Sequence, residues 1–153
     1  MCEARAAWHE AIGTRPTQET AIELVSYLLN KQLRDRIMAD TINTAEDQGT
    51  YRAVFIGMDS GRPDWSRVDA TEALLIDLLA FTPGEDRAAL FSYLGWLAWY
   101  KGQVSAAAAY FAKALDSEPA YRLAELLDEM LSSGLIAQTA TDPETAYRAG
   151  FGS

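Results

Sequence analysis

Apolar residues recur three and four positions apart along most of this chain, and no segment sustains an alternation of apolar and polar residues. Such spacing places apolar side chains on one face of a helix. One apolar stripe, in residues 17–29, ends with Leu28 and Leu29, and another lies within residues 66–81. The pattern predicts an all-α fold, a compact irregular bundle of about seven helices. YRAVFI at 51–56 is the one run with strand character, and it has no partner strand.

The clearest signal is a pair of helices over residues 86–101 and 104–117, joined by a turn at Gly102. The first of these helices is apolar nearly all round, which predicts a position at the centre of a bundle or beneath a partner. The second is rich in alanine, which allows two helices to pack closely. Pro119 then suits the first turn of a following helix, because its φ angle is fixed.

This helical pair resembles a tetratricopeptide unit, in which small and aromatic residues stand at fixed spacings. The pattern occurs once, whereas such arrays need about three repeats to bury their faces. We therefore expect a single tetratricopeptide-like hairpin inside the bundle. The matching positions are Leu94, Gly95, Gly102, Ala107, Phe111, Ala114 and Pro119.

Residues that favour helix ends stand between the apolar segments. Asn30 breaks the second helical run, and two pairs, Thr44 with Asp47 and Ser66 with Asp69, have the spacing of capping pairs that begin helices. The glycine and proline in DSGRPDW at 59–65 predict a loop, which is a candidate joint between two subdomains. With 153 residues, the chain is expected to form one domain over 1–153.

The chain is acidic, with 22 aspartates and glutamates against 13 lysines and arginines and a net charge of -9. No basic patch is available to contact phosphates, so the sequence predicts no nucleic-acid partner. An acidic inhibitor of the phage type, which mimics DNA, is an alternative. It would need a one-sided ridge of carboxylates, whereas the acidic residues are dispersed along the chain.

The single cysteine, Cys2, excludes an internal disulfide and fits a reducing compartment. The N-terminus lacks an apolar signal core. The longest apolar stretch, residues 93–100, is far shorter than the ~20 residues that span a bilayer. We expect a cytoplasmic protein with no membrane partner.

Catalytic patterns are nearly absent. The only histidine, His9, lies in WHEAIG, where a zinc-binding HExxH motif would need a second histidine at Gly13. Asp59 and Asp64 flank a glycine, but their spacing fits no calcium loop. The sequence therefore predicts no catalytic residue, no metal and no cofactor, and it favours a protein that is not an enzyme.

Tyr93, Trp96, Trp99 and Tyr100 form a cluster of aromatic residues in the helix at 86–101. Tryptophan and tyrosine are enriched in interface hot spots, so the cluster is a candidate interaction surface. The alternative is that all four side chains pack in the core, which is the commoner use of aromatic residues at helical spacing.

A second candidate surface is the basic group that contains Arg34 and Arg36. Arg36 stands four residues before Asp40, a spacing that favours an ion pair on one helix.

Several of these segments together resemble the family called domain of unknown function 4192. The resemblance covers about residues 20–136 and is carried by the helix LRDRIMAD, the aromatic helix and the alanine-rich helix, followed by EPAYRLA. It implies a relationship to the C-terminal half of a family found in actinobacteria and their phages. The family brings no activity that these residues would inherit.

These observations favour a structural or protein-interaction module, in which an aromatic and leucine-rich surface is covered by a partner protein or by a second copy of the chain. A small-ligand or catalytic pocket, lined by the same aromatic residues with Arg34 and Asp35, is the alternative that the sequence leaves open.

Overall fold

The computed structural model describes residues 2–44, 48–59 and 61–148. Over these residues it contains eight α-helices, two short 3-10 helices and no strand, which confirms the all-α prediction. The segment YRAVFI lies in the fourth helix and the turn after it. The elements are α1 (Glu3–Ala11), α2 (Gln18–Leu28), α3 (Lys31–Ile42), α4 (Gln48–Phe55), α5 (Trp65–Leu79), η1 (Gly84–Asp86), α6 (Arg87–Tyr100), α7 (Val104–Ser117), α8 (Arg122–Ser132) and η2 (Gln138–Thr141).

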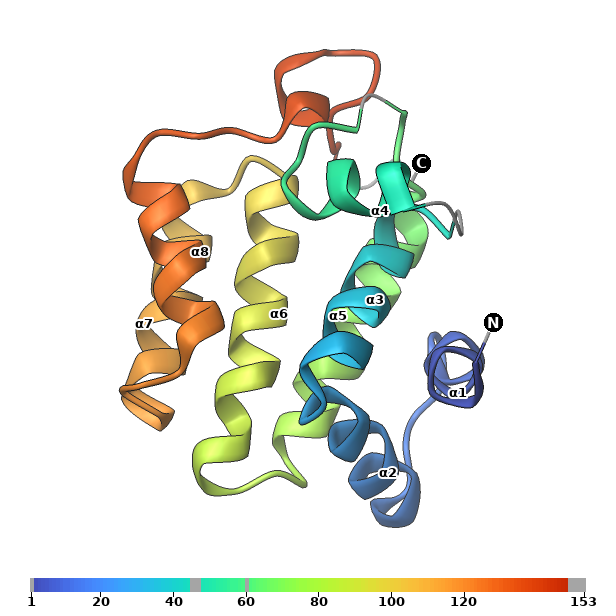
Figure 1. The fold of residues 1–153 in the computed structure, drawn as a ribbon. Helices are drawn as coiled ribbons and strands as arrows, with labels where there is room; N and C mark the ends of the chain where they lie inside the picture. The colour runs from blue at the N-terminus through green and yellow to red at the C-terminus, as the bar shows by residue number, and fades with distance from the viewer. Residues whose placement is uncertain (1, 45–47, 60, 149–153) are drawn as a thin grey trace.

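Helix α6 stands at the centre of the bundle (Figure 1). It packs against α7 and α8 on one side and α5 on the other, while α1, α2 and α4 are grouped around α3. Every residue from Ala88 to Tyr100 is buried as a result. The all-round apolar character of this helix is therefore explained by neighbours within the same chain.

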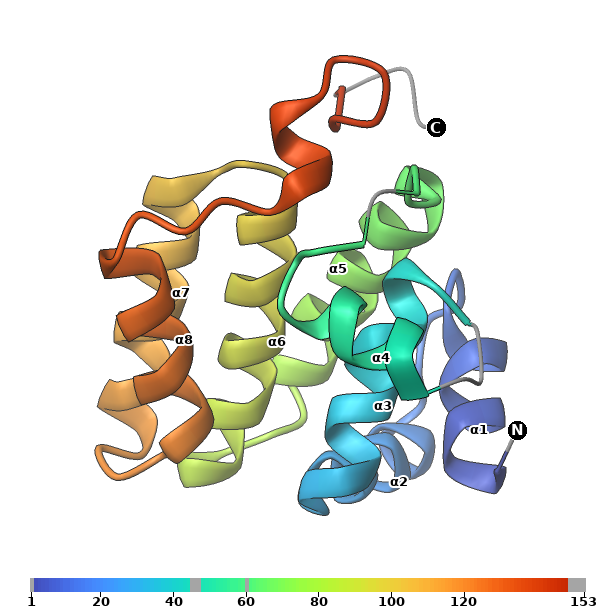
Figure 2. The ribbon, with the colours of Figure 1, turned by 45° about the horizontal axis from the view of Figure 1, so that its top comes forward.

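The segment after α8, residues 134–148, is here called the C-terminal strap, and it runs back across one end of the bundle (Figures 1 and 2). The Lys101 ammonium lies 4.1 Å from the centre of the Tyr147 ring and forms ion pairs with Asp69, at 2.6 Å, and Glu72. Burial alone would lower the pKa of Lys101, but the two carboxylates outweigh it and the pKa is raised. The strap is thus anchored to both α5 and the end of α6.

Several helix ends follow the sequence signals. The Asn30 side chain accepts a hydrogen bond from the Leu33 amide at 3.1 Å and begins α3. Gly102 has a φ angle of +77°, a conformation that side-chain-bearing residues rarely adopt, and it makes the turn between α6 and α7.

Other boundaries differ from the sequence prediction. Helix α5 begins at Trp65 and is capped by Asp64, which accepts from the Arg67 amide at 3.2 Å, rather than by Ser66. Pro119 precedes the first residue of α8 by three positions, because a turn separates the two helices. Leu29, expected in the buried stripe, follows the end of α2 and is 57% exposed. The predicted Thr44–Asp47 pair includes a residue outside the described ones.

Gly95 of α6 lies directly against the Phe111 ring of α7. A Cβ atom at this position would lie 2.6 Å from Cδ1 of Phe111, a ring that is itself completely buried. The absence of a side chain at Gly95 therefore leaves the space that the Phe111 ring occupies.

We expect Gly95→Ala to lower the free energy of unfolding by about 1–3 kcal/mol, although alanine is the better helix former by roughly 1 kcal/mol. Most of this loss should disappear when Gly95→Ala is made in a Phe111→Ala background, because the clashing ring is gone. Denaturant unfolding of the four proteins measures the coupling. Additive losses would show that the ring does not limit this position.

Candidate functional site

The four candidate aromatic residues lie inside the domain. Tyr93, Trp96, Trp99 and Tyr100 are each 1% exposed or less, so they belong to the core and present no surface on the folded chain. Trp96 and Trp99 both meet the Tyr100 ring edge-on, with ring centres 4.9 and 5.3 Å apart. Of the two interpretations that the sequence leaves open, burial supports packing in the core.

The polar atoms of this cluster hold other segments against α6. The indole N–H of Trp96 donates to the Phe55 carbonyl at 3.0 Å, and that of Trp99 donates to the Leu135 carbonyl at 2.8 Å. The Tyr100 hydroxyl donates to the Val54 carbonyl. These bonds join α6 to α4 and to the C-terminal strap, which gives the cluster a structural role.

The buried tyrosine hydroxyls are poorly suited to acid–base chemistry. Burial raises the pKa of Tyr93 and of Tyr100 well above the ordinary value of about 10. The Tyr93 hydroxyl is also hydrogen-bonded to Thr41 Oγ1 at 2.5 Å. Both tyrosines are therefore neutral at physiological pH.

The two candidate arginines lie on α3. Arg34 is 8% exposed and donates to the Asp35 carboxylate at 2.9 Å and to the Tyr121 hydroxyl at 3.0 Å. It thereby holds α3 against the start of α8. Arg36 is partly buried on the same helix.

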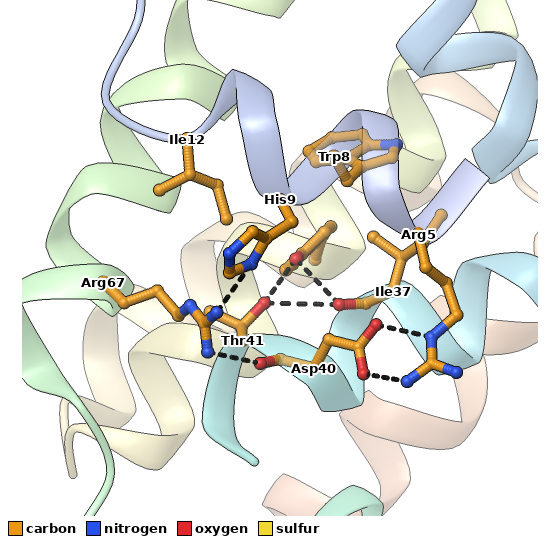
Figure 3. A pocket seen from close by; sticks show the side chains of 9 residues that line it. Arg5, Trp8, His9, Ile12, Ile37, Asp40, Thr41 and Arg67 are labelled. Atoms are coloured by element: carbon orange, nitrogen blue, oxygen red, sulfur yellow. Dashed lines mark hydrogen bonds and ion pairs between the residues drawn. The ribbon is translucent and has the colours of Figure 1, made fainter. Parts of the chain in front are cut away.

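Asp40, which the sequence pairs with Arg36, has a partner that the sequence did not predict. The Arg5 guanidinium, in α1, donates to both oxygens of its carboxylate, at 2.7 and 2.6 Å. Arg67 donates to the Asp40 main-chain carbonyl at 3.2 Å and to Nδ1 of His9 at 2.7 Å (Figure 3). This arrangement joins α1, α3 and α5.

The cavity beside this network is too small for a substrate. It is lined by Arg5, His9, Asp40, Arg67 and Tyr93 among others, and its volume is about 10 Å³. A cavity needs roughly 10–15 Å³ of accessible volume to hold a single water molecule. Arg34 and Asp35 do not line it. The cavity is a small gap in a structural network.

A larger concave surface is lined by residues of α2, of the α5–α6 connection and of the α7–α8 turn. These segments lie at the opposite end of the bundle from the strap (Figure 1). The surface has two adjoining hollows of about 190 and 220 Å³, and Leu29 and Asp86 line both. We call this surface the end groove. Its further lining residues include Ile22, Val25, Phe81 and Pro83 in the first hollow and Glu85, Ala89, Glu118 and Tyr121 in the second.

The first hollow of the end groove exposes large apolar side chains. Ile22 is 60% exposed, Leu29 57% and Phe81 40%. An exposed apolar patch of this kind, next to polar groups, is typical of an interaction site.

The second hollow is acidic. The Glu118 carboxylate accepts from the Ala120 amide at 3.1 Å. Glu85 lines the same hollow, and its interaction with Glu118 is the main reason why the pKa of Glu85 is raised. Asp86 adds a third carboxylate to the same hollow.

The end groove could not be predicted from the sequence, because three segments far apart in the chain build it. The one local signal was Phe81 in FTPG. This aromatic residue stands beside a turn, after the end of the helix whose apolar face could have buried it.

Neither a metal centre nor a membrane span is found among the described residues. No group of three or more histidine, cysteine, aspartate or glutamate side chains there is arranged to hold a metal ion. No helix in the described part of the chain has the length and apolar character needed to cross a bilayer.

Comparison with known proteins identifies a family and gives no activity. No curated protein and no solved structure match the chain. The family model described as domain of unknown function (DUF4192) matches residues 2–137, which extends the resemblance seen in the sequence to α1. This match covers most of the chain, and the protein therefore belongs to the DUF4192 family.

Proposed function

We propose that this protein is a non-enzymatic interaction module that binds a partner protein through the end groove. The observation that carries this proposal is the exposure of Ile22, Leu29 and Phe81 around one hollow, while the tryptophans of α6 are withdrawn into the core. The sequence left the aromatic residues of α6 as either a candidate contact surface or part of the core. Since the domain itself covers that helix, we place the contact at the end of the bundle instead.

The energetics of the groove fit a protein partner. Burying apolar surface contributes about 25 cal/mol per Å², so covering Leu29 and Phe81 supplies a useful part of a binding free energy. Interface energy is concentrated in a few side chains that fill hollows. Hollows of about 190 and 220 Å³ are smaller than the ~300–1,000 Å³ of ordinary small-ligand pockets, and they suit single side chains of a partner.

The positions of several acidic residues support this proposal over mimicry of DNA. Asp40 is held by Arg5, and Asp69 and Glu72 share Lys101. Asp64 caps α5. Carboxylates that are paired with basic side chains, or that cap a helix, contribute little to a surface that imitates the phosphates of DNA.

Affinity purification from a native lysate, with matched variants, tests the proposal. The bait carrying Leu29→Ser and Phe81→Ser should lose proteins that the unchanged bait retains. Ile76→Ser is the matched control, because Ile76 is 54% exposed on α5 and lies outside the end groove. Equal capture by all three baits, each shown to be folded by circular dichroism, would overturn the proposal.

A further inference from the structure

The end groove places an apolar hollow directly beside an acidic one. Leu29 and Asp86 line both hollows, so a single bound segment can occupy the two together. Phe81 lies on the apolar side, and Glu85 and Glu118 lie on the acidic side. An occupant that fills both hollows therefore needs apolar groups for the first and a positive charge for the second.

The acidic hollow is a place where a positive charge is favoured. Glu85, Asp86 and Glu118 line this one hollow, and carboxylates gathered in this way repel one another when they are ionised.

Two basic side chains in this neighbourhood already have partners. Arg34 is paired with Asp35 and also donates to the hydroxyl of Tyr121, which itself lines the hollow. Arg87 lies with its guanidinium carbon 5.6 Å from the centre of the Phe91 ring.

We propose, on the basis of the proposed function, that the end groove binds an amphipathic segment of a partner protein. Its apolar side chains pack on Leu29 and Phe81, and a lysine or arginine of the segment is bound between Glu85 and Glu118.

Charge complementarity selects this occupant over a second copy of the chain. A cation between the two carboxylates relieves their repulsion and forms charge-assisted hydrogen bonds with both. The net charge of -9 attracts basic partners and raises their association rate, whereas it repels another copy.

A selection from a random 12-residue peptide library displayed on phage tests the inference. The unchanged protein should enrich peptides with lysine or arginine close to aromatic or aliphatic residues. A synthetic peptide from that pool should bind about 5- to 10-fold more weakly to the Glu85→Gln, Glu118→Gln double variant, because exposed ion pairs contribute only modestly. The difference should shrink at 0.5 M salt. Glu19→Gln with Glu129→Gln, two exposed acidic residues elsewhere, should leave affinity unchanged.

The possible results separate this inference from the proposed function. Peptides without basic residues that still require Leu29 and Phe81 would overturn the inference and leave the proposed function standing. If no enriched peptide depends on Leu29 and Phe81, both are overturned. Sedimentation velocity tests the remaining alternative, in which a second copy of the chain fills the groove. A dimer that the Leu29→Ser substitution dissociates would show this and would overturn the inference.

Discussion

Replacing Trp99 with alanine is expected to lower the free energy of unfolding by about 3–5 kcal/mol, the usual range for removing a buried tryptophan. The ring of Trp99 is 1% exposed and fills the space above Gly57, where a Cβ atom would lie 2.8 Å from Cζ3 of the indole. Its N–H holds the Leu135 carbonyl. The variant therefore loses a large apolar contact and the attachment of the C-terminal strap together. Guanidinium unfolding followed by circular dichroism measures the loss.

Trp99→Phe separates the two contributions. It keeps much of the ring but leaves the Leu135 carbonyl without its donor, and we expect a smaller loss of about 1–3 kcal/mol. Amide hydrogen exchange at Gln138, whose N–H donates to the Gly57 carbonyl at 2.8 Å, reports on the strap. Exchange should accelerate in both variants. A Trp99→Ala protein within 1 kcal/mol of the unchanged one would contradict this account of α6 as the support of the strap.

Features determined by neighbouring residues could be predicted from the sequence. Helix α7 has the predicted bounds, and α3 begins directly after Asn30, where the sequence places a break, because Gly102 and Asn30 act on the backbone next to them. The start of α5 was misplaced for a related reason. Asp64 and Ser66 are both good capping residues only two positions apart, and the choice of Asp64 coincides with the complete burial of Trp65 next to it.

The burial of individual side chains, and the contacts between segments far apart in the chain, could not be predicted in the same way. Helical spacing shows which residues share a face, but it does not show whether another element covers that face. The aromatic residues of α6 were therefore ambiguous until α5, α7 and α8 were placed around them. The end groove was missed for the complementary reason: Leu29 continues the apolar stripe of α2 in sequence, yet it follows the helix end, where no element covers it.

The ion pair between Arg5 and Asp40 is the other interaction whose loss should be severe. Arg5 is 7% exposed and the Asp40 side chain 17%, and the guanidinium bonds both carboxylate oxygens. Removing one partner leaves a charge with little water around it. We expect Arg5→Met alone to lower the free energy of unfolding by about 3 kcal/mol, the lower end of the range for a buried pair, because Asp40 keeps some contact with solvent.

The double variant Arg5→Met, Asp40→Leu should recover most of this loss, because no uncompensated charge remains and the apolar side chains can pack between α1 and α3. Denaturant unfolding of both single variants and the double variant gives the coupling free energy, which should exceed about 1.5 kcal/mol. Arg15→Met, at an exposed position, is the control and should change stability by less than about 0.5 kcal/mol. A small coupling with a large loss from Arg5→Met would show that the methylene stem of Arg5, rather than its charge, holds α1 against α3.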